Sequence, residues 1–127
     1  MDTPTHNTLP KKERLCGKTS ISRLLAEGKH GSVEGLRYLC MTGSGCDTNR
    51  IMVSVPKKLF KRAVKRNLLK RRIRESYRKQ KHGLEIKEGL DILFMYSTKE
   101  VLGYEAIYKA VGEIIIKLNR KYGGEIQ

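Results

Sequence analysis

The feature that most constrains the fold of this sequence is a dense run of positive charge in the middle of the chain. The stretch from Pro56 to His82 holds thirteen Lys or Arg residues and one acid, Glu75, whereas the other hundred residues carry fourteen basic and twelve acidic groups. We expect residues 61–79 of this run to form a helix. Because its side chains repel one another, only a specific role explains why such a helix is present.

A narrow apolar stripe would attach this helix to the rest of the fold. At 100° per residue, Leu69, Ile73 and Tyr77 lie on one face and are predicted to dock on a sheet. The same face leads back to Arg66 and Arg62, which are cationic. The first turns of the helix are therefore expected to extend beyond the core or to lie on its rim.

Beside the stripe, cations repeat at i, i+4 spacing and form four like-charged pairs, each costing roughly 0.2–0.5 kcal/mol, or about 1–2 kcal/mol together. Glu75 is expected to offset a little of this by facing Arg71 and Lys79. An ordinary solvated face usually mixes both signs of charge. The excess on one segment, within a net charge of +14, instead predicts a polyanionic ligand. The repeating cations are Arg62, Arg66, Lys70, Arg74 and Arg78.

The residue types suit phosphate groups. The planar fork of Arg can bind phosphate oxygens bidentately, while Lys adds a point charge and the helix N-terminus adds free N–H groups. Asn67 carries both a donor and an acceptor, which suits a ribose hydroxyl or a base edge. Contact with about six to ten phosphates would lower affinity on the order of 10³–10⁵-fold between 50 and 200 mM salt.

Three strands are expected. Residues 35–42 and 50–55 are rich in apolar residues and flank the turn 43–49, so we predict that they pair as a hairpin. Residues 90–97 form the third strand. The segment HGSVEG, residues 30–35, is expected to be a loop, part of which could extend the sheet.

Two more helices are expected around this sheet. One spans 19–28, with Thr19 or Ser20 as its N-cap and Gly28 at its end. The other spans 104–122 and carries the most regular apolar stripe of the chain. The sequence thus predicts a single domain over residues 9–123, between disordered tails at 1–8 and 124–127.

The sequence offers little for protein-based catalysis. Its three cysteines, Cys16, Cys40 and Cys46, show no metal-ligand spacing, and no Asp/Glu/His cluster or Ser/His/Asp arrangement is evident, so no catalytic or metal-binding residue is predicted. The start, MDTPTHNTLP, has no apolar stretch, and no run approaches the roughly 18 apolar residues of a membrane span. These features favour a cytoplasmic protein with free thiols and no membrane partner.

The segment VPKKLFKRAVKRNLLKRRIRESYR, residues 55–78, resembles the signature of the protein subunit of bacterial ribonuclease P. That family has a Lys-Lys pair after a strand, then a helix with Arg-Asn-Arg, a basic run and Arg-Glu. The resemblance extends over about residues 9–122. One departure lies in the helix, where Leu68 stands in place of the second signature Arg. The matching residues are Lys57 and Lys58, Arg66 and Asn67, Lys70 and Arg71, and Arg74 and Glu75.

The resemblance implies an α+β fold. It would be a two-layer α/β sandwich like that of some ribosomal proteins, with a mixed sheet of about four strands and a left-handed β-α-β crossover through the basic helix. It also implies a function, in which the protein and a catalytic RNA remove the 5′ leader from precursor tRNA by phosphodiester hydrolysis. The Mg²⁺ for that reaction would be bound by the RNA. A 1:1 complex is expected.

By this resemblance, one set of residues is expected to bind RNA and another to line a cleft for the leader. The family places aromatic residues on its first helix, where this chain has Ile21 and Leu25, and another on its first strand, where it has Tyr38. These three are the expected cleft residues. The expected RNA-binding residues are Arg14, Lys57, Lys58, Lys61, Arg62, Arg66, Asn67, Lys70, Arg71 and Arg74.

Two other classes of protein remain open at this point. A ribosomal or chaperone-like RNA-binding protein could carry the same basic helix without serving a cleavage reaction. A DNA-binding regulator could place the helix in a major groove, but it usually needs a helix-turn-helix partner immediately upstream. Strands and Pro56 occupy that place here, so no DNA partner is expected.

Overall fold

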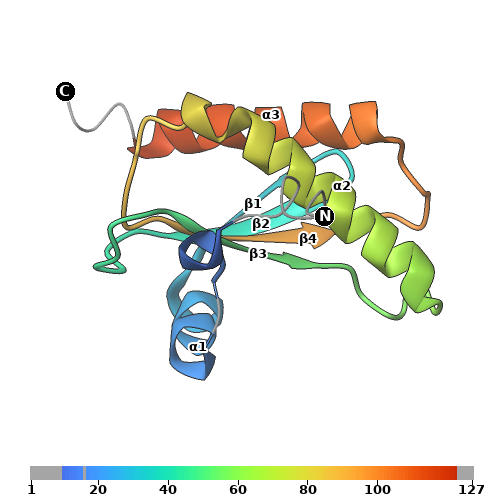
Figure 1. Cartoon of the computed structure of the whole chain (residues 1–127), viewed down its shortest axis with the longest axis horizontal. Helices are drawn as coiled ribbons and strands as arrows, with labels where there is room; N and C mark the ends of the chain where they lie inside the picture. Colours follow the sequence, from blue (N-terminus) through green and yellow to red (C-terminus); the bar gives the residue numbers. More distant parts are fainter. Residues whose placement is uncertain (1–9, 16, 123–127) are drawn as a thin grey trace, which may run out of the picture.

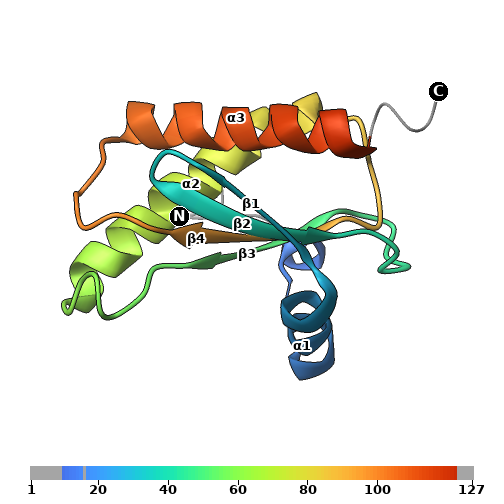
Figure 2. The ribbon, with the colours of Figure 1, turned by 180° about the vertical axis from the view of Figure 1, so that it is seen from behind.

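The computed structural model describes residues 10–15 and 17–122, which form a four-stranded sheet with helices on both faces (Figure 1). Helices α2 and α3 cover one face, and α1 lies on the other, as the view from behind also shows (Figure 2). The expected tails lie outside the described residues. In chain order the elements are η2 (Lys11–Glu13), α1 (Lys18–Glu27), β1 (Lys29–Val33), β2 (Leu36–Met41), β3 (Arg50–Ser54), α2 (Ala63–Gln80), η3 (Lys81–Gly83), β4 (Asp91–Tyr96) and α3 (Tyr104–Tyr122).

The strands lie in the order β1-β2-β4-β3. β2 is antiparallel to both β1 and β4, whereas β3 is parallel to β4. The segment HGSVEG does extend the sheet, since it supplies most of β1. The predicted hairpin between the strands at 35–42 and 50–55 is wrong, because β4 lies between β2 and β3.

The central place of β4 follows from its composition. Ile92 and Phe94 are fully buried on one face of the sheet, and Leu93 is 5% exposed on the other. A strand that is apolar on both faces is stable only where both faces are covered. The interior of this sheet, between β2 and β3, meets that condition.

Helix α2 connects two parallel neighbouring strands, β3 and β4, so it has to cross one face of the sheet (Figure 1). The resemblance implies that this connection is left-handed, although such crossovers are nearly always right-handed. The crossing places α2 beside α3 on the same face. The mixed α+β architecture is therefore confirmed.

Alternation along the strands divides the core into two parts. Leu36, Tyr38 and Cys40 of β2 face the large cluster under α2 and α3. Leu39 faces the opposite side, where it packs with Leu24 of α1 in a smaller cluster. Most of the apolar material thus lies beneath α2 and α3, and α1 covers only part of its face.

The ends of α1 agree only in part with expectation. Gly28 is its C-cap, as predicted, but the N-cap is Gly17 rather than Thr19 or Ser20. Gly17 has a φ of 96°, which a glycine adopts without strain. The helix therefore begins three residues earlier than a side-chain cap at Ser20 would have allowed.

Candidate nucleic-acid interface

Helix α2 is docked by one stripe and leaves most of its circumference outside the core. Leu69 and Ile73 are fully buried and Tyr77 is 1% exposed, as their spacing predicted. At the other end residues 62–65 are all exposed, and Val64 keeps 78% of its surface accessible. Figure 1 shows this end extending past the strands. The first turns therefore carry their cations into solvent.

Arg66 fixes the start of α2. Its Nη1 donates to the carbonyl oxygens of Phe60 at 2.9 Å and Lys61 at 2.8 Å, which ties the loop before the helix to its first turn. Arg62 is the N-cap residue and provides no side-chain cap. The first N–H groups of α2 thus lack a capping side chain, and helix N-termini of this kind favour anions.

Arg14 lies close to Arg74, although sixty residues separate them in sequence. The N-terminal segment runs along the free edge of β3, where Arg14 forms a parallel bridge with Ile51 and the Leu15 N–H donates to the Ile51 carbonyl at 2.7 Å. The pKa of Arg74 is lowered by burial and, secondarily, by the charge of Arg14. The structure therefore brings these two predicted RNA-binding residues together on one flank of α2.

Several other predicted residues on or near α2 have side chains that no contact holds. Lys57 and Lys58 lie on the turn after β3, and both are exposed. Within residues 10–15 and 17–122, no hydrogen bond or ion pair engages the side chain of Lys58, Asn67 or Lys70. We call the surface formed by the following residues the basic flank. Its members are Arg14, Lys57, Lys58, Lys61, Arg62, Arg66, Asn67, Lys70, Arg71 and Arg74.

Of the two cations that Glu75 was expected to face, Lys79 is confirmed, whereas Arg71 forms no ion pair with Glu75. Its carboxylate accepts two hydrogen bonds from Arg78, at 3.0 and 2.5 Å, and lies 3.7 Å from the Lys79 ammonium. The hydrogen bond from Arg78 is the main reason why the pKa of Glu75 is lowered. Arg78 is therefore neutralised within the protein, which takes the last cation of the i, i+4 series out of the basic flank.

The other flank of α2 faces α3 and serves packing. Arg72 donates to the Leu102 carbonyl at 2.6 Å, and Gln80 donates to the Tyr108 carbonyl at 2.9 Å. These bonds join α2 to the start of α3. Arg72 thus serves the packing of α2 on α3, whereas Lys70 on the basic flank makes no bond to the described residues.

The predicted cleft residues do not lie together. Ile21 packs on the small cluster under α1, and Leu25 is 57% exposed on the same helix. Tyr38 is only 8% exposed and points to the opposite face of the sheet, into the core beneath α2 and α3. The expectation that Tyr38 lines a cleft with the α1 residues is therefore wrong.

A cleft does exist between α1 and the part of the sheet that α1 leaves uncovered. Its volume is 490 Å³, and its lining includes Leu25, His30, Arg37, Leu39 and Met95. Sequence reasoning missed Arg37, His30 and Met95. The alternation of β2 could have found Arg37, because that residue shares a face with Leu39 and not with Tyr38.

The described part of the chain contains no group of three or more His, Cys, Asp or Glu side chains placed to hold a metal ion. The buried carboxylate of Asp91 is bound by Arg50 through two hydrogen bonds of 2.9 and 2.8 Å. Nor does any helix in these residues have the length and apolar character to cross a membrane.

Comparisons with known proteins agree with this geometry. The family model described as Ribonuclease P matches residues 9–119. The chain is 35% identical over 125 residues to the ribonuclease P protein component of Porphyromonas gingivalis, covering 93% of this chain and 91% of the relative. It is 37% identical over 114 residues to that of Dictyoglomus turgidum, covering 90% and 92%.

Solved structures show the same fold. The RNase P protein from Thermotoga maritima matches with a TM-score of 0.71 at 25% identity, over 83% of this chain and 96% of that one. The RNase P protein of Staphylococcus aureus matches with a TM-score of 0.70 at 23% identity, over 84% and 94%. With the matching family model and relatives, this shows that the chain belongs to the ribonuclease P protein family and serves as a subunit of ribonuclease P in tRNA 5′ processing.

Proposed function

We propose that the basic flank binds the catalytic RNA of ribonuclease P and that the cleft beside α1 holds the 5′ leader of precursor tRNA. One protein molecule would bind one RNA in a cytoplasmic ribonucleoprotein. The holoenzyme would then remove the leader by hydrolysing one phosphodiester bond.

The observation that carries the proposal is the approach of cations from two separate parts of the chain. Arg14 of the N-terminal segment lies close to Arg74 of α2, the helix that also carries Lys70. Glu75, the acid of α2, is bound to Arg78 and so does not offset the charge of Lys70 and Arg74. A phosphate backbone would supply the missing negative charge.

In this proposal the chemistry belongs to Mg²⁺ held by the RNA, which would activate water and stabilise the leaving oxygen. The protein's own residues orient the two RNA molecules and do not touch the reacting atoms. The internal pairing of Asp91 with Arg50 agrees with this division, because it occupies a carboxylate that could otherwise have contributed to catalysis.

The basic flank can be tested by removing two cations that have no structural bond. Arg66 is unsuitable because it holds the loop before α2, so Lys70→Ala with Arg74→Ala is the better pair. We expect the slope of log affinity against log salt to fall by about two, and affinity to drop roughly 50-fold near 0.1 M salt. A filter-binding titration with ribonuclease P RNA at several salt concentrations measures both.

The matched control is Lys99→Ala with Lys109→Ala, which removes the same charge elsewhere from two exposed side chains that no bond to the described residues holds. Equal losses in both double variants would mean that only net charge matters and would refute the basic flank. Reconstitution separates the remaining alternative: a ribosomal or chaperone-like protein would bind RNA but would not restore leader removal by the catalytic RNA at low Mg²⁺.

The cleft can be tested through Arg37, which is exposed and lines it. If Arg37 contacts the leader backbone, Arg37→Ala will raise the KM for a precursor with a long leader and leave the KM for a precursor with a one-nucleotide leader unchanged. The same increase for both substrates would exclude a leader contact. Scrambling the leader sequence should have little effect, since a cation reads phosphate rather than base.

A further inference from the structure

A second pocket lies at the C-terminal end of α2, where η2, the loop between β2 and β3, and η3 meet. Its volume is 230 Å³, and its lining includes Glu13, Thr48, Tyr77, Lys81, His82 and Lys87. None of these residues is among the matching residues of the family signature, and none lines the cleft beside α1. The pocket therefore needs its own explanation.

Tyr77 forms the buried wall of this pocket. The residue is 1% exposed and its ring packs on Phe94, with the ring centroids 5.9 Å apart. Its hydroxyl group forms no hydrogen bond to the described residues. Burial, and to a lesser extent the Glu13 carboxylate, raise the pKa of Tyr77, so the hydroxyl stays protonated. Tyr77 thus brings to the lining of the pocket a hydrogen-bond donor that has no acceptor among the described residues.

Ammonium groups surround the same space. Lys81 Nζ lies 2.7 Å from Glu13 Oε1, and Lys87 Nζ donates to the His82 carbonyl at 3.0 Å. Each ammonium has three protons, so both retain donors after these bonds. Two lysines against one carboxylate leave the pocket positive even with His82 neutral.

The pocket continues the basic flank. Glu13 directly precedes Arg14, and Tyr77 follows Arg74 by three residues, less than one turn along α2. Since Arg14 and Arg74 lie close together, the cations of the flank lead to the mouth of the pocket from both segments. An RNA strand bound along the flank would reach it without a change of direction.

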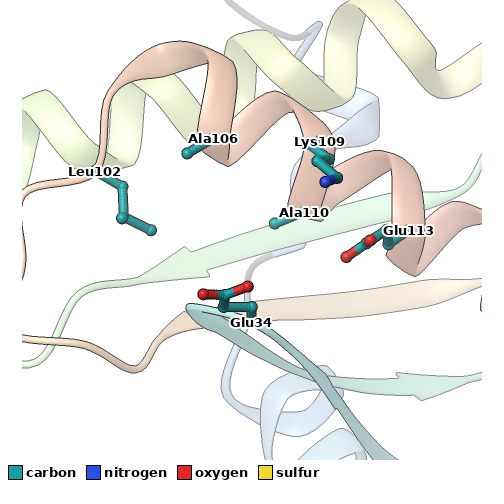
Figure 3. A pocket seen from close by; sticks show the side chains of 6 residues that line it. All are labelled: Glu34, Leu102, Ala106, Lys109, Ala110 and Glu113. Carbon is teal, nitrogen blue, oxygen red and sulfur yellow. The ribbon is translucent and has the colours of Figure 1, made fainter.

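A pocket of equal volume elsewhere shows that charge, not size, sets this one apart. Between α3 and the turn that joins β1 to β2, a cavity of 230 Å³ is lined by Glu34 and Glu113, with Lys109 as its only cation among the described lining residues (Figure 3). Figure 3 shows both carboxylates beside an apolar wall that includes Leu102. That cavity repels phosphate and provides an internal control.

We infer that the pocket formed by Tyr77, Lys81 and Lys87 takes a backbone phosphate of RNA, one contact beyond those of the basic flank. The inference rests on the proposed function, because it needs RNA on that flank. The phosphate accepts the hydrogen bond from the Tyr77 hydroxyl and lies against the two ammonium groups. The bound RNA then spans both ends of α2.

Two variants test this inference by different readouts. Tyr77→Phe removes one hydroxyl and keeps the packing on Phe94, so we expect thermal stability to stay equal or rise while RNA affinity falls roughly three- to tenfold with an unchanged salt slope. Lys87→Ala should lower the salt slope by about one. Lys109→Ala removes a cation from the acidic pocket and should change neither quantity.

The source of the phosphate is found by measuring binding twice. The first titration uses ribonuclease P RNA with free protein, and the second uses precursor tRNA with the assembled holoenzyme. Loss in either titration supports a phosphate site and assigns it to that RNA. If Tyr77→Phe and Lys87→Ala both keep the wild-type affinity and salt slope while the Lys70/Arg74 double variant binds more weakly, the inference about the pocket is overturned and the proposed function is not. If the wild-type protein fails to bind RNA, the proposed function falls together with it.

Discussion

At the scale of single residues, the structure shows which cations are internal and which are available. Arg66 and Arg72 donate to backbone carbonyl groups, and Arg78 is bound to Glu75. Lys70 has no such bond within the described residues, and Arg74 lies beside Arg14. A helical wheel predicted the flank, but it could not predict these partners. They depend on rotamers and on segments distant in sequence.

Repulsion around Arg74 predicts a trade-off between stability and binding. Arg74→Gln removes like-charge contacts with Lys70 and Arg14, each worth roughly 0.2–0.5 kcal/mol at low salt by analogy with i, i+4 pairs. We expect a slightly higher melting temperature for the free protein and weaker RNA binding. The gain should vanish in about 1 M salt, which shortens the Debye length to about 3 Å. A gain that persists at high salt would point to packing instead.

The ion pair of Glu75 predicts a pH dependence of stability. Because the folded-state pKa of Glu75 is lowered, the unfolded chain binds more protons, and the stabilisation is fully present above the unfolded value of about 4.3. It is lost as the pH falls through the folded value. Glu75→Gln should therefore lower the melting temperature near pH 6, and this effect should shrink as the pH falls below the unfolded value. Glu88→Gln, in an exposed loop, serves as the control.

At the scale of elements, α2 has two functions on two faces. Ile73 is fully buried, and truncating a buried Ile to Ala costs about 2–5 kcal/mol. Ile73→Ala should therefore unfold at much lower denaturant, yet keep the salt slope of RNA binding while it is folded. Lys70→Ala should leave the denaturant midpoint nearly unchanged and lower the salt slope of RNA binding. Urea titration and RNA binding on the same samples compare them, and a change of slope in Ile73→Ala would contradict this division.

The elements themselves were largely predictable, but their pairing was not. Helix α2, helix α3 and three strands follow from apolar spacing in the sequence. β1 has few apolar residues because it is an edge strand, so its sequence resembles a loop. The hairpin rule failed for β2 and β3 because β4, which arrives after α2, offers both of them a strand that is apolar on both faces.

The cleft beside α1 could not be predicted from the sequence for a similar reason. Alternation along β2 separates Tyr38 from Leu39, but it does not reveal which face α1 will cover. Gly31, opposite Tyr38 on β1, shows how closely the ring is packed: a Cβ there would lie 2.2 Å from the Tyr38 Cζ. Tyr38 thus serves the packing between β1 and β2, whereas only the family resemblance assigned it to the leader cleft.

At the scale of the whole molecule, the basic flank and the pocket lined by Glu34 and Glu113 lie at opposite edges of the sheet. The basic flank lies over β3 and the N-terminal segment, while α3 and the turn between β1 and β2 carry the pocket with Glu34 and Glu113. The two edges are separated by β2 and β4. This asymmetry orients the protein on a polyanion before any specific contact forms.

The asymmetry predicts which lysines RNA will shield. On adding ribonuclease P RNA, acetylation of Lys57, Lys58 and Lys70 should slow strongly, because their ammonium groups then lie against phosphates. Lys109 and Lys117 on α3 should react as in the free protein. Mass spectrometry after a brief acetylation pulse measures each site, at low salt and again at a concentration that releases the RNA. Salt reverses only the shielding that comes from phosphate contact. Two results would show that charge does not set the bound orientation. One is protection of the α3 lysines, and the other is protection of the basic-flank lysines that remains after salt has released the RNA.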